Sequence, residues 1–199
     1  MIFYIARFLV SLPYYIGLHP RIRGWKRLHF KGPAILVSNH WSIADPVFIA
    51  LLCLRPVYYM AKVELFEKPV GAFFMRGLKT LPVEKGDAAS LSSVRAAAGL
   101  LEKGKIFGIF PEGHRAVLDE MDDMSRGAAF LAARCKVPVI PVYSDPATLR
   151  HMHSRMNIGE PILVEDAVRT YGGKPVNAVN QAITDSLQRL RWEQEGIRR

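Results

Sequence analysis

The residues best suited to chemistry are His40 and Asp45, which lie five positions apart in the segment NHWSIAD at residues 39–45. Histidine can accept a proton near neutral pH. A carboxylate that folds back onto its other ring nitrogen would fix the tautomer and stabilise the imidazolium that forms on proton transfer. The sequence contains no G-x-S-x-G motif for a nucleophilic serine, so the pair predicts activation of a substrate hydroxyl. The pattern also fits a structural histidine followed by an aspartate that caps a helix.

A second polar cluster lies at residues 110–115, which read FPEGHR. Gly113 would let a ligand approach the backbone closely, and Arg115 could bind an anion through both arms of its guanidinium. The alternative is a turn held by an ion pair between Glu112 and Arg115. Farther upstream, Lys79 and Lys85 flank a short strand candidate. Either lysine could hold a phosphate or simply face solvent, and for Lys79 the surface position is the simpler interpretation.

The histidine and the FPEGHR cluster each follow an apolar run that is expected to form a strand, which is where α/β sheets place their sites. Strand candidates alternate with helix candidates from residue 33 to residue 143, and a long amphipathic helix is expected at 176–195. This order predicts an α/β domain with a largely parallel central sheet flanked by helices. The expected strands are 33–38, 56–61, 80–83, 105–110, 137–143 and 156–165, the last with a turn at Gly159. The expected helices before the C-terminal one are 46–54, 64–75, 88–103 and 125–135.

The chain has 199 residues with 27 Lys and Arg against 18 Asp and Glu, which gives a net charge of +9. Such a charge is typical of proteins that bind nucleic acid, an anionic membrane or an anionic small substrate. Six of the net charges fall in residues 1–44, which contain no acidic residue. Two distant cysteines provide neither a disulfide framework nor a CxxC metal site, and a reducing compartment is expected.

The N-terminal segment combines apolar, aromatic and basic residues. Fourteen of residues 1–18 are apolar, but Arg7 and Pro13 interrupt the run, and a helix of this length would reach only about 27 Å, short of a bilayer core. We therefore expect residues 1–28 to be a helical membrane-interface segment and residues 29–199 to be the folded domain. The basic run that follows would face anionic lipid; its members are Arg21, Arg23, Lys26 and Arg27. The alternative is a first helix packed onto the domain core.

Three motifs in order, N-H-x4-D at 39–45, F-P-E-G-x-R at 110–115 and V-P-V-I-P-V at 137–142, resemble the glycerolipid acyltransferase family. The typical member of this family is the bacterial 1-acylglycerol-3-phosphate acyltransferase, and the resemblance covers roughly residues 30–145. Two positions depart from the family pattern. His114 stands where Thr is common, and Lys85 stands where the family's second block usually ends in Arg.

The resemblance implies an O-acyltransferase that moves a fatty acyl group from acyl-CoA or acyl carrier protein to the free hydroxyl of a lysophospholipid such as 1-acylglycerol-3-phosphate. It implies that His40 is the general base and Asp45 orients it, without a metal or organic cofactor. The implied acceptor-binding residues are Lys85, Glu112, Gly113 and Arg115. The expected location is the cytoplasmic face of a membrane, peripheral or monotopic, on an anionic lipid surface.

Other functions stay open at this point. The acceptor could be another lyso-lipid, such as a lyso-amino-acid lipid, because both departures from the family pattern fall in the acceptor-binding blocks. A thioesterase would result if water replaced the acceptor, and a non-catalytic lipid-binding module of the membrane surface would retain the fold alone. No nucleic-acid partner is expected, because the sequence has no recognised nucleic-acid motif and its excess charge lies beside an apolar anchor.

Overall fold

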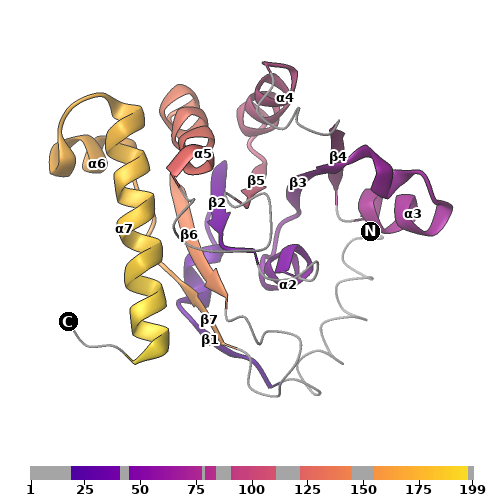
Figure 1. Ribbon diagram of the computed structural model, residues 1–199, viewed down its shortest axis with the longest axis horizontal. Helices are drawn as coiled ribbons and strands as arrows, with labels where there is room; N and C mark the ends of the chain where they lie inside the picture. The colour runs from indigo at the N-terminus through magenta and orange to yellow at the C-terminus, as the bar shows by residue number, and fades with distance from the viewer. Residues whose placement is uncertain are drawn as a thin grey trace.

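The computed structural model describes residues 19–40, 45–77, 79–83, 91–110, 122–144 and 155–196. Its strands form one sheet in the order β1-β7-β6-β2-β5-β3-β4 (Figure 1). Neighbouring strands run parallel except for β6 and β7, which are antiparallel. The strands are β1 (Arg21–Arg23), β2 (Ala34–Ser38), β3 (Val57–Lys62), β4 (Thr80–Val83), β5 (Ile106–Ile109), β6 (Val139–Ser144) and β7 (Arg155–Ile158). The prediction of a largely parallel sheet flanked by helices is confirmed. Of the helical segment predicted at 1–28, residues 1–18 lie outside the described residues, and residues 21–23 form strand β1 instead of helix.

Helices cover both faces of the sheet, as its apolar strands require. All five residues of β2 are buried, and such a continuous apolar strand must be shielded from water on both sides. The helices are η1 (Trp25–Leu28), α2 (Asp45–Leu52), η2 (Val63–Phe66), α3 (Pro69–Gly77), α4 (Leu91–Glu102), α5 (Asp122–Cys135), α6 (Val164–Tyr171) and α7 (Pro175–Glu195), of which η1 and η2 are 3₁₀ helices.

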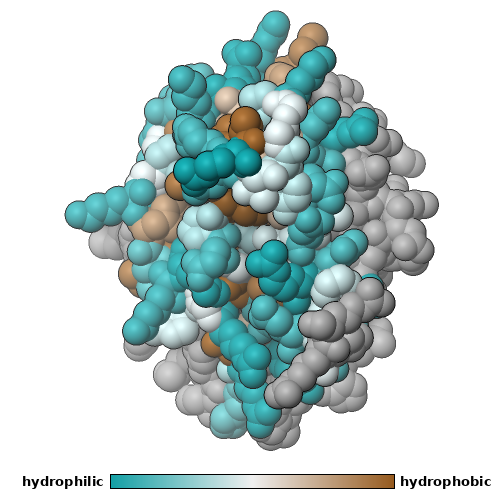
Figure 2. All heavy atoms as spheres, turned by 90° about the vertical axis from the view of Figure 1, so that its left-hand side faces the viewer, coloured by the Kyte–Doolittle hydropathy of each residue, from teal (hydrophilic) through white to brown (hydrophobic). Residues whose placement is uncertain are grey.

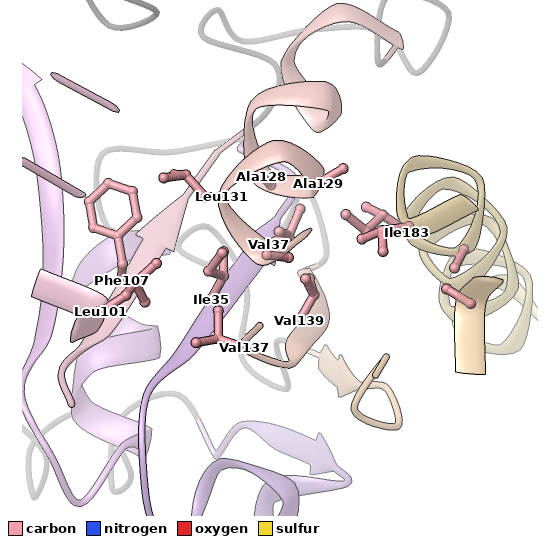
Figure 3. Close-up of a cluster of buried hydrophobic side chains, with 14 of the residues drawn as sticks. Ile35, Val37, Leu101, Phe107, Ala128, Ala129, Leu131, Val137, Val139 and Ile183 are labelled. Carbon is pink, nitrogen blue, oxygen red and sulfur yellow. The ribbon is translucent and has the colours of Figure 1, made fainter. Parts of the chain in front are cut away.

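Alternate residues of β2 enter two separate cores, because successive strand side chains point to opposite faces. Ile35 and Val37 pack with α4, α5 and α7, and Figure 3 shows them in the layer between the sheet and the last two of these helices. Ala34 and Leu36 pack on the other face with α2. The helix α5 contributes mainly alanines to the first core, three of them fully buried, namely Ala128, Ala129 and Ala132. Small side chains let this helix lie close to the sheet and to α7.

The structure departs from the predicted elements at three places. Strand β7 ends at Ile158, Ile162 forms only an isolated antiparallel bridge with Val139, and residues 164–171 form helix α6, so the strand predicted at 156–165 is wrong in its last part. The helix predicted at 64–75 is divided into η2 and α3, with Pro69 at the first position of α3, where its missing N–H costs nothing. Strand β1, which was not predicted, adds an edge to the sheet by pairing with β7.

The face that carries α6 and α7 is mostly hydrophilic (Figure 2). The long helix α7 buries one side, including Ile183, Leu187 and Leu190, and presents charged residues on the other. Among the helices in the described part of the chain, none is both long enough and apolar enough to cross a membrane.

Candidate active site

His40 and Asp45 meet at the carboxyl end of the central strand. His40 follows β2 by two residues, and Asp45 is the first residue of α2. Nδ1 of His40 lies 3.3 Å from Oδ2 of Asp45, and the side chains are 23% and 0% exposed. The two atoms lie within ion-pair distance, and Nδ1 forms no hydrogen bond. Because Asp45 faces Nδ1, Nε2 is the ring nitrogen left for a substrate.

A buried polar cluster ties the carboxyl ends of β2 and β6 together behind this pair. The side-chain amide of Asn39 donates to the carbonyl oxygen of Ser144 at 2.8 Å, and its oxygen accepts the backbone N–H of Ser144 at 2.8 Å. The Ser144 hydroxyl lies 3.4 Å from Oδ1 of Asp45. All three side chains are buried. The cluster therefore contacts the carboxylate oxygen that does not face His40.

Two aromatic rings support the histidine from the neighbouring strands. The ring of Phe110, just past β5, lies 4.7 Å from that of His40 between centroids, and 5.8 Å from the stacked ring of Tyr59 on β3. The Tyr59 hydroxyl donates to the carbonyl oxygen of Pro46 at 3.0 Å, next to Asp45. Burial, and to a smaller extent Cys53, raise the pKa of Tyr59 well above its usual value. The phenol therefore stays protonated and keeps this hydrogen bond.

Glycine at position 108 makes room for the Tyr59 ring. A Cβ atom at Gly108 would lie 2.2 Å from Cε1 of Tyr59, far inside van der Waals contact. The small residue lets β5 pass directly under the ring that positions Phe110.

The other predicted site residues, Lys85, Glu112, Gly113 and Arg115, lie outside the described residues, as does His114. The strands that precede them are described. β4 ends at Val83 and β5 at Ile109, and both run parallel to β3, as β5 does to β2. Their carboxyl ends therefore point to the sheet edge that carries His40. Lys79 is exposed at the amino end of β4, away from this edge, in agreement with a surface position.

Sequence reasoning missed Ser144 and Tyr59 as parts of this site, and it gave Phe110 no role of its own within the FPEGHR cluster. Phe110 opens the FPEGHR cluster and Ser144 follows the VPVIPV run, so proximity to a motif was the available signal. Within the described residues, no group of three or more His, Cys, Asp or Glu side chains could hold a metal ion. The chemistry that the described geometry can perform is proton transfer at Nε2 of a histidine backed by a carboxylate.

Comparison with known proteins decides the family. The family model described as Acyltransferase matches residues 19–145, which include β2, β5, β6 and the His40–Asp45 pair. The chain belongs to the acyltransferase family. The recognition made from the three motifs is thus confirmed.

Three relatives of this acyltransferase share one name. The chain is 31% identical over 163 residues to "1-acyl-sn-glycerol-3-phosphate acyltransferase" of Streptococcus pneumoniae, and the match covers 78% of this chain and 60% of that protein. It is 29% identical over 162 residues to the protein of the same name from Bacillus subtilis, covering 78% and 80%. With the beta form of Homo sapiens it shares 29% over 140 residues, covering 69% and 50%. The chain therefore spans between half and four fifths of these three relatives.

The solved structure of the 1-acyl-sn-glycerophosphate (LPA) acyltransferase PlsC from Thermotoga maritima is similar to this acyltransferase. The TM-score is 0.62 at 19% sequence identity, over 89% of this chain and 75% of that chain. At this identity the likeness establishes a shared fold.

Proposed function

We propose that this acyltransferase transfers a fatty acyl group from an acyl thioester to the free hydroxyl of a lysophospholipid such as 1-acylglycerol-3-phosphate. The observation that carries the proposal is the contact of Nδ1 of His40 with the buried carboxylate of Asp45, 3.3 Å apart. It lies at the carboxyl edge of a parallel sheet, inside the segment that matches the family. The names of the relatives support this choice of acceptor.

The reaction follows from the orientation of the imidazole. Nε2 of His40 takes the proton of the acceptor hydroxyl while the oxygen attacks the thioester carbonyl. Asp45 stabilises the imidazolium that forms. When the tetrahedral intermediate collapses, the C–S bond breaks and the imidazolium returns its proton to the departing thiolate. The acyl group passes directly between substrates, so no acyl-enzyme forms. The donor is acyl-CoA or acyl carrier protein.

The acceptor phosphate would be held by cations that follow β4 and β5. Arg115 provides a planar fork for a phosphate, and Lys85 provides a point charge. Glu112 and Gly113 complete the acceptor side. The convergence of the ends of β4, β5 and β2 at one sheet edge supports this assignment, although these four residues follow the described strands rather than belong to them.

We further propose that the carboxyl edge of the sheet faces an anionic membrane on its cytoplasmic side, with residues 1–28 at the interface. Ser144, at the end of β6, pairs with Met156, and Arg155, which begins β7, pairs with Arg21, which begins β1. The start of β1 therefore lies at the edge that carries His40. This position supports entry of a lipid substrate from the surface that the basic run would bind.

Acyl transfer is tested on the purified chain in mixed vesicles with 1-acylglycerol-3-phosphate and either acyl-CoA or acyl carrier protein, with mass-spectrometric detection of products. We expect His40→Gln to reduce kcat by about 100-fold or more, because it removes the general base. Melting temperatures of both proteins verify that the variant is folded. Undiminished turnover by folded His40→Gln would contradict the mechanism. Vesicle binding without turnover on a panel of lyso-lipids would instead favour a non-catalytic lipid-binding module.

A further inference from the structure

Ser144 is the last residue of β6, and its side chain is fully buried beside Asp45. Its hydroxyl lies 3.4 Å from Oδ1 of Asp45, whereas Oδ2 of the same carboxylate faces His40. We propose that Ser144 is a positioning residue, which holds Oδ1 so that Oδ2 stays directed at Nδ1 of His40. The inference rests on the proposed function, in which Asp45 orients the general base.

Asp45 is the preferred acceptor for the single proton of the Ser144 hydroxyl. Two acceptors are within reach, Oδ1 of Asp45 at 3.4 Å and Oδ1 of Asn39 at 3.5 Å. The Asn39 oxygen already accepts the backbone N–H of Ser144 at 2.8 Å. A carboxylate is the stronger acceptor, because its negative charge strengthens the hydrogen bond. The hydroxyl therefore donates to Asp45.

Asn39 fixes the position of Ser144, the donor of this hydrogen bond. Its side-chain amide forms both an accepting and a donating hydrogen bond, each 2.8 Å, with the backbone of Ser144. These bonds continue the pairing of β2 with β6, whose last register pair is Ser38 and Val142. Asn39 is 2% exposed and Ser144 0%. The backbone at Ser144 is thus hydrogen-bonded to the residue that precedes His40.

A carboxylate at this position needs such a support. The terminal torsion of an aspartate side chain is broad and has no sharply preferred angle, so covalent geometry alone does not direct Oδ2 at the histidine. The 3.4 Å separation is long for a hydroxyl donor. Hydrogen bonds of catalytic groups are often long before substrate binds and shorten in the reacting complex. We expect this one to shorten as the imidazolium forms.

The test follows His40 directly, by NMR at one fixed pH of protein labelled with 15N-histidine, with the resonances assigned by His40→Gln. The 15N chemical shifts report which ring nitrogen carries the proton. A carboxylate that faces Nδ1 holds the tautomer protonated there, so Asp45→Asn should reduce the fraction of this tautomer. We expect Ser144→Ala to reduce it by a smaller amount, and Ser144→Thr, which keeps the hydroxyl, to leave it near the wild-type value.

Kinetics provide the second readout. Ser144→Ala should lower kcat by about tenfold, a fraction of what loss of the base costs, with the acceptor KM unchanged and with recovery in Ser144→Thr. If Ser144→Ala does not fold, Ser144→Cys fills the same space with a weak donor and should show the same two effects.

The outcomes separate this inference from the proposed function. A His40 tautomer fraction that stays at the wild-type value in folded Ser144→Ala or Ser144→Cys would overturn the positioning role, as would a fraction insensitive to Asp45→Asn. If wild-type protein transferred no acyl group to any acceptor while the tautomer fractions followed the predicted order, the proposed function would fail and the positioning role would stand.

Discussion

At the residue scale, the burial of Asp45 distinguishes it from the surface aspartates. Its side chain is 0% exposed and faces His40, whereas Asp166 on α6 is 52% exposed and pairs with Arg169. Asparagine keeps the shape of aspartate but removes the charge that stabilises the imidazolium. We expect Asp45→Asn to lower kcat by about 100-fold or more and Asp166→Asn to leave it unchanged. Steady-state assays of the two variants make the comparison, and equal kcat values would contradict the role of Asp45.

Gly108 provides a second prediction at this scale, through packing. A Cβ at this position would lie 2.2 Å from Cε1 of Tyr59, so the Tyr59 ring must move and disturb Phe110 and His40. Overpacking of this kind costs about 1–3 kcal/mol. We expect Gly108→Ala to lower the free energy of unfolding by this amount and to lower kcat as well. Urea denaturation and kinetic assays measure the two effects.

The matched control is Gly127→Ala in helix α5. A Cβ there meets no atom within 4 Å, and alanine favours a helix over glycine by about 1 kcal/mol. Gly127→Ala should therefore keep full activity and gain stability. A similar gain in Gly108→Ala would show that the Tyr59 ring can shift without cost.

At the element scale, the sequence indicated those helices and strands whose pattern of apolar residues lies within one continuous segment. β2 was recognisable from one continuous apolar run, and α7 from a helical apolar pattern over many residues. β1 has only three residues, two of them arginines, and it exists because β7, more than a hundred residues later, provides its partner. Helix α6 is eight residues long, too short to separate its pattern from that of the preceding strand.

In the candidate site too, contacts between residues close in sequence could be predicted, whereas contacts between distant segments could not. His40 and Asp45 are five residues apart, so their contact could be anticipated from sequence. Ser144 reaches Asp45 across 99 positions of sequence, through the neighbouring strands β2 and β6. Only the register of these strands brings the serine to the carboxylate. Side chains that support a catalytic pair from another strand carry no spacing signal and require the fold.

The attachment of η1 to β7 gives a prediction for an element. Arg27 donates to the carbonyl oxygen of Ile158 and pairs with Glu160, so one member of the basic run serves the fold. Arg27→Met keeps the aliphatic stem but loses both bonds, and we expect it to lower the free energy of unfolding by about 1–2 kcal/mol. Arg169→Met removes only an exposed ion pair on α6 and should change it by less than about 0.5 kcal/mol. Urea denaturation at one temperature compares them, and equal losses would contradict a structural role for Arg27.

At the scale of the whole molecule, the cations divide between the two edges of the sheet. Arg21, Arg23 and Lys26 are exposed on β1 and η1, and β1 begins at the edge that carries His40. Lys79, Lys103 and Lys105 are exposed just before β4 and β5 begin, at the opposite edge. If the carboxyl edge faces anionic lipid, the first three should dominate binding, since attraction to the surface falls off within a Debye length of about 10 Å.

Two triple variants with the same net charge test this orientation. Glutamine at positions 21, 23 and 26 should weaken binding to vesicles that contain anionic lipid by about a hundredfold, at about 1 kcal/mol for each cation near the surface. Glutamine at positions 79, 103 and 105 should have a much smaller effect, and the wild-type protein should bind less tightly as salt is raised. Vesicle co-sedimentation measures all three proteins. Equal weakening by the two variants would mean that net charge alone drives association, and the carboxyl edge would then have no preferred contact with the membrane.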